Sequence, residues 1–139
     1  AASRGDDRDA FLVLVSPHRR AISGICIGIT CDRHLAERAV QHTLAAAWQY
    51  LDRFDPPPSL QAWLAQIAYR ASMKDVAHRA GPATTGSPLA HLAPDYRAAL
   101  VLTDIGALTT GEIAELQGVP RDIVISRIRR ARQAVHRLA

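Results

Sequence analysis

The sequence predicts an all-α protein made of two small helical domains joined by a short linker. Apolar residues recur at helical spacing along most of the chain, and no segment alternates as a half-buried strand does. Aromatic residues make up only 5% of the 139 residues, whereas alanine, the best helix former, is abundant. Proline- and glycine-rich stretches divide the helical segments. This length has room for two small helical units.

The first half of the chain predicts three helices. Residues 1–9 are polar and charged, and we expect them to fray. A helix follows over about 10–29, in which Pro17 should introduce a kink or separate a first turn. Asp32 can cap a second helix that runs to about residue 54, and Ser59 can cap a third. The prolines at 56–58 give a stiff connection between the two.

Candidate core residues follow from these helices. Trp48 and Trp63 each lie on an apolar stripe, which favours a core position over a base-stacking role. Cys26 and Cys31 do not have the spacing of a metal or redox pair, so we expect buried free thiols in a cytoplasmic protein. Four polar residues lie largely off the stripe of the third helix: Tyr69, Arg70, Lys74 and Arg79.

The second half predicts a helix-turn-helix. Residues 80–88 cannot hold a helix, and a further helix is expected over about 95–105. Thr109 and Glu112 then have the spacing of a capping box. Gly118 stands where a helix ends in a left-handed residue, and Pro120 where the next begins.

The last helix has two distinct faces. Its apolar stripe consists of Val124, Ile128, Ala131, Val135 and Leu138. Its opposite face carries Ser126, Arg129, Arg130, Gln133 and Arg137, flanked by Arg127 and Arg132. No acidic residue follows Asp122. Such a helix has the charge and shape to enter a DNA major groove, although the arginines would also serve simply to keep a surface helix soluble.

Charge and composition narrow the function. The net charge of +4 favours a polyanionic partner. The six histidines are scattered and form no ligand pair with carboxylate or cysteine, so we expect no enzyme, metal, cofactor or small-molecule substrate. No apolar run long enough to span a membrane is evident, and we expect no membrane insertion.

Taken in order, several segments resemble bacterial sigma factors of the extracytoplasmic-function (ECF) group of the sigma-70 family. In the first half they are residues 36–44, 47–48, 51–54 and 60–68. In the second half they are residues 92–97, 112–115 and 126–132. Together they cover nearly the whole chain and end in the helix-turn-helix.

The resemblance implies a division of labour. Residues 1–79 would bind core RNA polymerase and the minus-ten promoter element, residues 80–90 would be a linker, and residues 91–139 would bind the minus-thirty-five element. Glu37 and Gln41 would contact polymerase. The loop at 54–59 would contact the non-template strand, as would three side chains of the third helix: Tyr69, Arg70 and Lys74.

For the last helix, the resemblance implies DNA contacts along its polar face. The residues that match the DNA-contacting run of the family are Ser126, Arg127, Arg129 and Arg130. We expect Arg121, where the helix begins, and Gln133 to join them. An anti-sigma factor is a further expected partner.

The chain departs from the family pattern at several contact positions. Arg38 and His42 stand where the family usually carries acids that serve polymerase binding. At the entry to the recognition helix, Asp122, Ile123 and Ile125 replace a glycine, a phosphate-binding threonine and a lysine.

These departures leave alternatives open. A working sigma factor is one reading. A sigma-like domain that binds a regulatory protein, such as an anti-sigma factor, is another. An ordinary helix-turn-helix repressor would explain only the C-terminal part.

Overall fold

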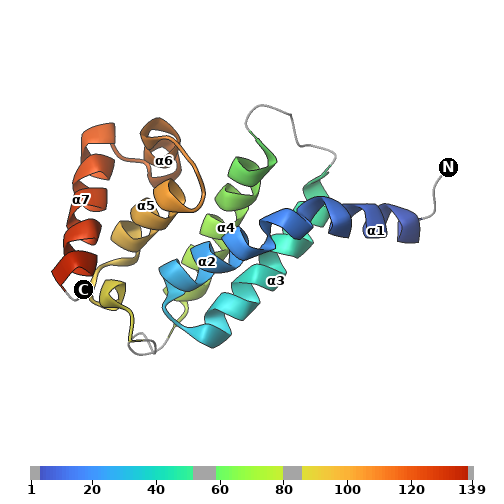
Figure 1. Cartoon of the computed structure of the whole chain (residues 1–139), viewed down its shortest axis with the longest axis horizontal. Helices are drawn as coiled ribbons and strands as arrows, with labels where there is room; N and C mark the ends of the chain where they lie inside the picture. The colour runs from blue at the N-terminus through green and yellow to red at the C-terminus, as the bar shows by residue number, and fades with distance from the viewer. Residues whose placement is uncertain (1–3, 52–58, 80–85, 138–139) are drawn as a thin grey trace.

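A computed structural model describes residues 4–51, 59–79 and 86–137. For residues 4–6 it describes the backbone alone. In this described part every regular element is a helix and no strand occurs, which confirms the all-α prediction (Figure 1). The elements are α1 (Arg4–Val15), η1 (Ser16–His18), α2 (Arg19–Thr30), α3 (Arg33–Tyr50), α4 (Leu60–Ala77), η3 (Pro88–His91), α5 (Pro94–Asp104), α6 (Thr110–Gln117) and α7 (Arg121–Arg137).

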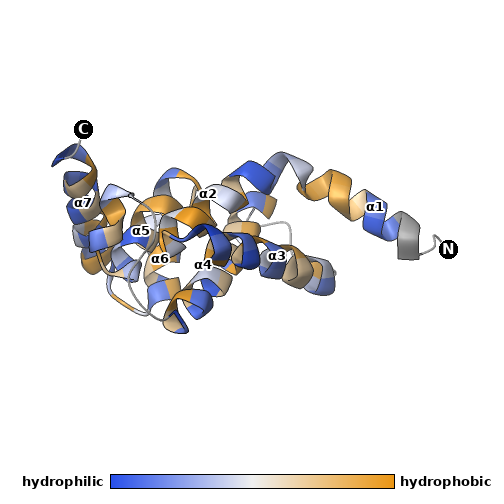
Figure 2. Ribbon diagram, turned by 90° about the horizontal axis from the view of Figure 1, so that it is seen from below, coloured by the Kyte–Doolittle hydropathy of each residue, from blue (hydrophilic) through white to orange (hydrophobic). Residues whose placement is uncertain are grey.

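The N-terminal segment is more ordered than its composition suggested. Residues 4–9 are helical within α1, so the prediction that they fray is wrong. The N-terminal part of α1 projects from the rest of the molecule (Figures 1 and 2), while Phe11 near its other end packs edge-on against Trp48 at 5.4 Å. Pro17 lies in the 3-10 turn η1, which separates α1 from α2 as expected.

Helices α2, α3 and α4 form the first domain, and side-chain caps fix where α3 and α4 begin. The Asp32 carboxylate accepts a hydrogen bond from Leu35 N at 3.0 Å, and the Ser59 hydroxyl accepts one from Ala62 N at 3.2 Å. Between them, the predicted end of the second helix and its prolines lie at 52–58, outside the described residues.

The second domain is built on the predicted helix-turn-helix. The Thr109 hydroxyl accepts from Glu112 N, and the Glu112 carboxylate accepts from Thr109 N, so the capping box is complete. Gly118 ends α6 with φ 67°, in the left-handed region. Helix α7 packs on α5, α6 and η3.

The two domains are packed against each other, because α5 lies along α2 and also contacts α4. The approach of α5 to α2 depends on two glycines. A Cβ atom added at Gly28 would lie 2.6 Å from Cγ1 of Val101, and one added at Gly24 would lie 3.2 Å from Cδ1 of Ile105. Buried residues of both domains therefore form one core, and Figure 2 shows apolar residues gathered along α2.

Arg97 of α5 joins the domains from inside this core. Its side chain is only 1% exposed, and its Nε donates to the Ile29 carbonyl at 2.8 Å, near the end of α2. Its Nη1 donates to the Leu92 carbonyl, whereas its Nη2 is buried without a partner. Burial lowers the pKa of this guanidinium from its ordinary value. A buried cation thus caps a helix of the other domain.

The prediction that no apolar run is long enough to span a membrane is wrong. The segment Asp7–Thr30 is long and apolar enough to span a membrane by length and composition. Helices buried in a protein core have the same character, and the second half of this segment supplies Ile22, Ile25 and Ile29 to the core.

Candidate nucleic-acid interface

Helix α7 buries one face and exposes the other. Val124 and Ala131 are fully buried, and Ile128 is partly buried between the two apolar clusters of the protein. The predicted stripe does not extend further, because Val135 is 38% exposed; Leu138 lies outside the described residues. The buried turns hold the helix on its domain and fix the direction in which its polar face points.

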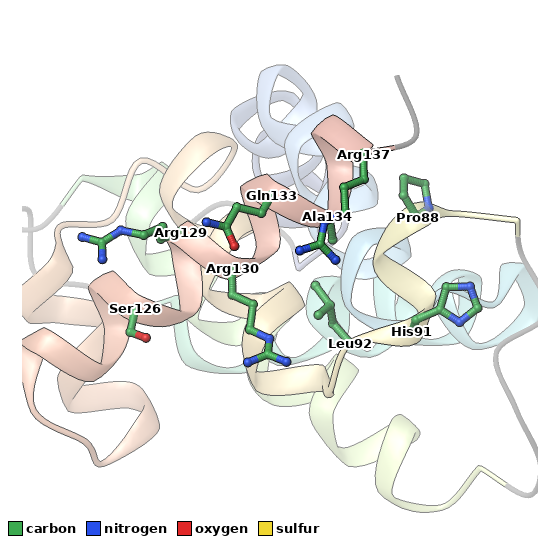
Figure 3. Close-up of a pocket in the computed structure, with 9 residues that line it drawn as sticks. All are labelled: Pro88, His91, Leu92, Ser126, Arg129, Arg130, Gln133, Ala134 and Arg137. Atoms are coloured by element: carbon green, nitrogen blue, oxygen red, sulfur yellow. The ribbon is translucent and has the colours of Figure 1, made fainter.

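The exposed face of α7 lines a cleft against the 3-10 turn η3 (Figure 3). Figure 3 shows Arg130 and Arg137 extending on the side of Leu92, whereas Arg129 extends in the other direction. None of the described residues that line the cleft is acidic. The lining residues of α7 are Ser126, Arg129, Arg130, Gln133, Ala134 and Arg137. This arrangement of cations beside polar side chains suits a phosphate backbone.

Arg127, the second residue of the predicted DNA-contacting run, is held by contacts within the protein. Its Nη1 donates to the side-chain Oε1 of Gln117 at 2.8 Å, and the Gln117 Nε2 in turn donates to the backbone carbonyl of Asp95 at 2.9 Å. The Arg127 guanidinium also lies 5.7 Å from the centre of the Tyr96 ring, and that of Arg130 lies 6.0 Å from it. Arg127 therefore ties α7 to α5 and α6.

Arg121, where α7 begins, lies against the first turn of α6. A Cβ atom added at Gly111 would be 2.9 Å from the Arg121 Nη2, so the two helix N-termini of the helix-turn-helix meet at this side chain. Arg132, on the flank of the polar face, forms an exposed pair with Asp104 at 2.9 Å.

The residues of the first domain that were predicted to contact DNA differ in their exposure to solvent. Arg70 and Lys74 are exposed on α4. Tyr69 is only 8% exposed, so the prediction that it lies off the buried face is wrong. Burial raises the pKa of the Tyr69 phenol, and the nearby carboxylate of Asp95 in the second domain raises it further. The loop at 54–58 lies outside the described residues.

The residues predicted to contact polymerase lie on the exposed side of α3. Glu37 and Gln41 are one turn apart and both exposed. Glu37 borders a largely apolar groove between α2, α3 and the end of α5, in which Gly24, Ile27 and Ile105 take part. In residues 4–51, 59–79 and 86–137, no group of three or more histidine, cysteine, aspartate or glutamate side chains is arranged to hold a metal ion.

Sequence reasoning missed three residues that organise this region. Arg97, Tyr96 and Gln117 make the contacts that join α5 to α2 and to the helix-turn-helix. Arg97 did give a signal, since it is a charged residue at a helical position whose neighbours one turn later, Leu100 and Val101, are apolar.

Comparison with known proteins agrees with this architecture. Residues 14–80 match the family described as Sigma-70 region 2, and residues 89–135 match Sigma-70 region 4. The ECF RNA polymerase sigma factor SigG of Mycobacterium tuberculosis, from two strains, is 26% identical over 93% of this chain. The chain spans 47% of the length of these relatives.

Solved structures show the same fold. CnrH, in complex with the cytosolic domain of CnrY, is 30% identical with a TM-score of 0.71, over 94% of this chain and 88% of that one. The sigma factor RpoE, in complex with the anti-sigma factor NepR from Bartonella quintana, is 26% identical with a TM-score of 0.70, over 95% and 96%. The chain therefore belongs to the sigma-70 family, in the extracytoplasmic-function group of bacterial RNA polymerase sigma factors.

Proposed function

We propose that this protein is a promoter-specificity subunit that binds core RNA polymerase and directs initiation at promoters carrying minus-ten and minus-thirty-five elements. The observation that carries the proposal is the arginine-rich face of α7, exposed on the second helix of a helix-turn-helix in a chain that contains both sigma regions. Its site of action would be the cytoplasm, and it would act by binding, without catalysis.

Residues 91–139 would recognise the minus-thirty-five element. Ser126, Arg129, Arg130 and Gln133 share one exposed face, where arginines neutralise phosphates and the N-terminal residues of the helix read base edges. Arg121, which lies beside the first turn of α6, would contact the phosphate backbone of the DNA. Arg127 would act mainly by positioning α7, because its guanidinium is engaged with Gln117 and Tyr96.

Residues 1–79 would serve the minus-ten element and polymerase. Arg70 and Lys74 are exposed cations on α4, suited to an unpaired DNA strand. Tyr69 would join them only after the second domain moves away from it, since it is buried here near Asp95. Glu37 and Gln41 on α3 would dock on polymerase, and residues 80–90 would link the domains.

A second candidate function is capture by an anti-sigma factor without activity as a full sigma factor. Two observations favour it: Tyr69 is masked by the second domain, and a similar sigma factor is known in complex with an anti-sigma factor. Arg38 and His42 are both exposed on α3, beside the proposed polymerase contacts, where the family usually carries acids.

The test is co-purification with core RNA polymerase, followed by transcription from a pool of promoters. Stable binding and initiation at a consistent set of promoters are expected, and Arg129→Ala with Arg130→Ala should reduce initiation while leaving polymerase binding intact. A folded protein that does not bind core polymerase would favour the second candidate, and a pull-down would then identify its protein partner.

A further inference from the structure

Two isoleucines are exposed in the first turns of α7, the helix that carries the basic face. Ile125 is 47% exposed and Ile123 is 40% exposed, although Val124 between them is fully buried. Exposed aliphatic side chains form no hydrogen bonds with water. Beside a DNA phosphate they would displace water from the charged oxygens without replacing the hydrogen bonds that this water makes. An apolar contact is the interaction that they can make with a partner.

The two isoleucines differ in their surroundings. Ile125 precedes Arg129 by one helical turn, so both lie on one side of the exposed face, next to Ser126. Ile123 precedes Arg127 by one turn, on the side where α7 is tied to Gln117 and Tyr96. Ile125 thus adjoins the free part of the basic face, whereas Ile123 adjoins a part that the protein itself occupies.

A major groove offers one apolar group to such a side chain. Thymine is the base that carries a methyl group, at C5, and contact between this methyl and an aliphatic side chain is an established form of base readout. Residues near the start of a recognition helix are those that reach base edges. An isoleucine there also donates no hydrogen bond, so it cannot select guanine as a lysine or arginine does.

We propose that Ile125 selects thymine at one position of the DNA site by apolar contact with its C5 methyl group. This assignment rests on the proposed function, and it makes Ile125 a specificity-determining residue whose contribution is independent of the phosphate contacts of Arg129 and Arg130. Ile123 makes no such contribution.

The test removes the methyl group from the DNA and the side chain from the protein. Preferred sites are first selected from random duplexes by the full chain, both alone and bound to core RNA polymerase. Each thymine of the selected site is then replaced in turn by deoxyuridine, which lacks only the methyl. At one position this should weaken binding about fourfold, the amount that burial of a single methyl or methylene group provides.

Two matched variants assign that effect. With Ile125→Ala the deoxyuridine effect at this position should disappear, while the salt dependence of binding stays unchanged. With Ile123→Ala, which removes a similarly exposed isoleucine from the same helix, the effect should remain. Ile125→Lys should shift the preferred base at that position towards guanine.

Selected sites without a sensitive thymine, or a deoxyuridine effect that persists in Ile125→Ala, would overturn the assignment and leave the proposed function standing. If neither the chain nor its complex with polymerase prefers any DNA sequence, the proposed function and the assignment fall together.

Discussion

A methyl group at Gly28 tests whether the two domains pack in solution as they do in the structure. The added Cβ of Gly28→Ala would lie 2.6 Å from Cγ1 of Val101, whereas carbon atoms in favourable contact are about 3.5–4.0 Å apart. Helices α2 and α5 must therefore separate locally by about 1 Å, or Val101 must change rotamer. Overpacking of this kind costs about 1–3 kcal/mol.

Helix propensity acts in the opposite direction. Alanine is better than glycine inside a helix by about 1 kcal/mol, and Gly28 lies within α2. The free energy of unfolding of Gly28→Ala should thus be unchanged or reduced by up to ~2 kcal/mol. In a Val101→Ala background the nearest remaining atom is Cβ of residue 101, at 3.5 Å, which is an ordinary contact. There Gly28→Ala should stabilise by about 1 kcal/mol.

The assay is urea unfolding of the four proteins of this double-mutant cycle, followed by far-ultraviolet circular dichroism. Gly24→Ala is the matched control, because its added Cβ would lie 3.2 Å from the flexible end of Ile105. It should be close to neutral. If Gly28→Ala stabilises equally in both backgrounds, then α5 does not pack on α2 in solution, and the described domain arrangement is refuted.

Four further predictions concern a buried cation, the basic face of α7, an apolar contact of α7 and a residue with positive φ. Arg97→Met should lower the free energy of unfolding by about 2–4 kcal/mol in urea titrations, since it leaves the Ile29 and Leu92 carbonyls without their donor; a change below ~1 kcal/mol would mean that the cation is not buried. Arg129→Ala with Arg130→Ala should weaken DNA binding and reduce its logarithmic salt slope by about 2; an unchanged slope would show that this face does not meet DNA. Ile128→Asp should unfold the second domain, because it places a charge between the two apolar clusters, and normal helicity and thermal stability would contradict that assignment. Ala107→Gly should raise the free energy of unfolding by up to ~1 kcal/mol, because Ala107 has φ 57°, and a lower melting temperature would refute this strain.

Local chemistry made much of the fold predictable. The starts of α3, α4 and α6 follow from side chains that satisfy backbone donors within three residues, at Asp32, Ser59 and Thr109. The end of α6 follows from the freedom of Gly118 to adopt a positive φ. The polar face of α7 follows from helical period alone, since Val124 and Ala131 fix which side is buried.

Contacts between distant segments could not be predicted in this way. The burial of Tyr69 depends on the second domain, and the engagement of Arg127 depends on Gln117 and Tyr96, which belong to other helices. Gly24 and Gly28 provide the space in which α5 lies, and that role depends on a helix more than 65 residues later in the chain. Periodicity shows which face of a helix is apolar, and it does not show which helix covers that face.

The cap that Arg97 places on α2 also has a consequence for synthesis. Its donor and acceptor are 68 residues apart in the chain, and the acceptor is made first. At ~5–20 residues per second, α2 spends about 3–14 s on the ribosome before its covering helix exists. Until α5 is made, Gly28 and the Ile29 carbonyl lack the helix that covers them in the folded protein. A helix that bound α2 during this interval would not have to displace α5, whereas one that arrived after folding would.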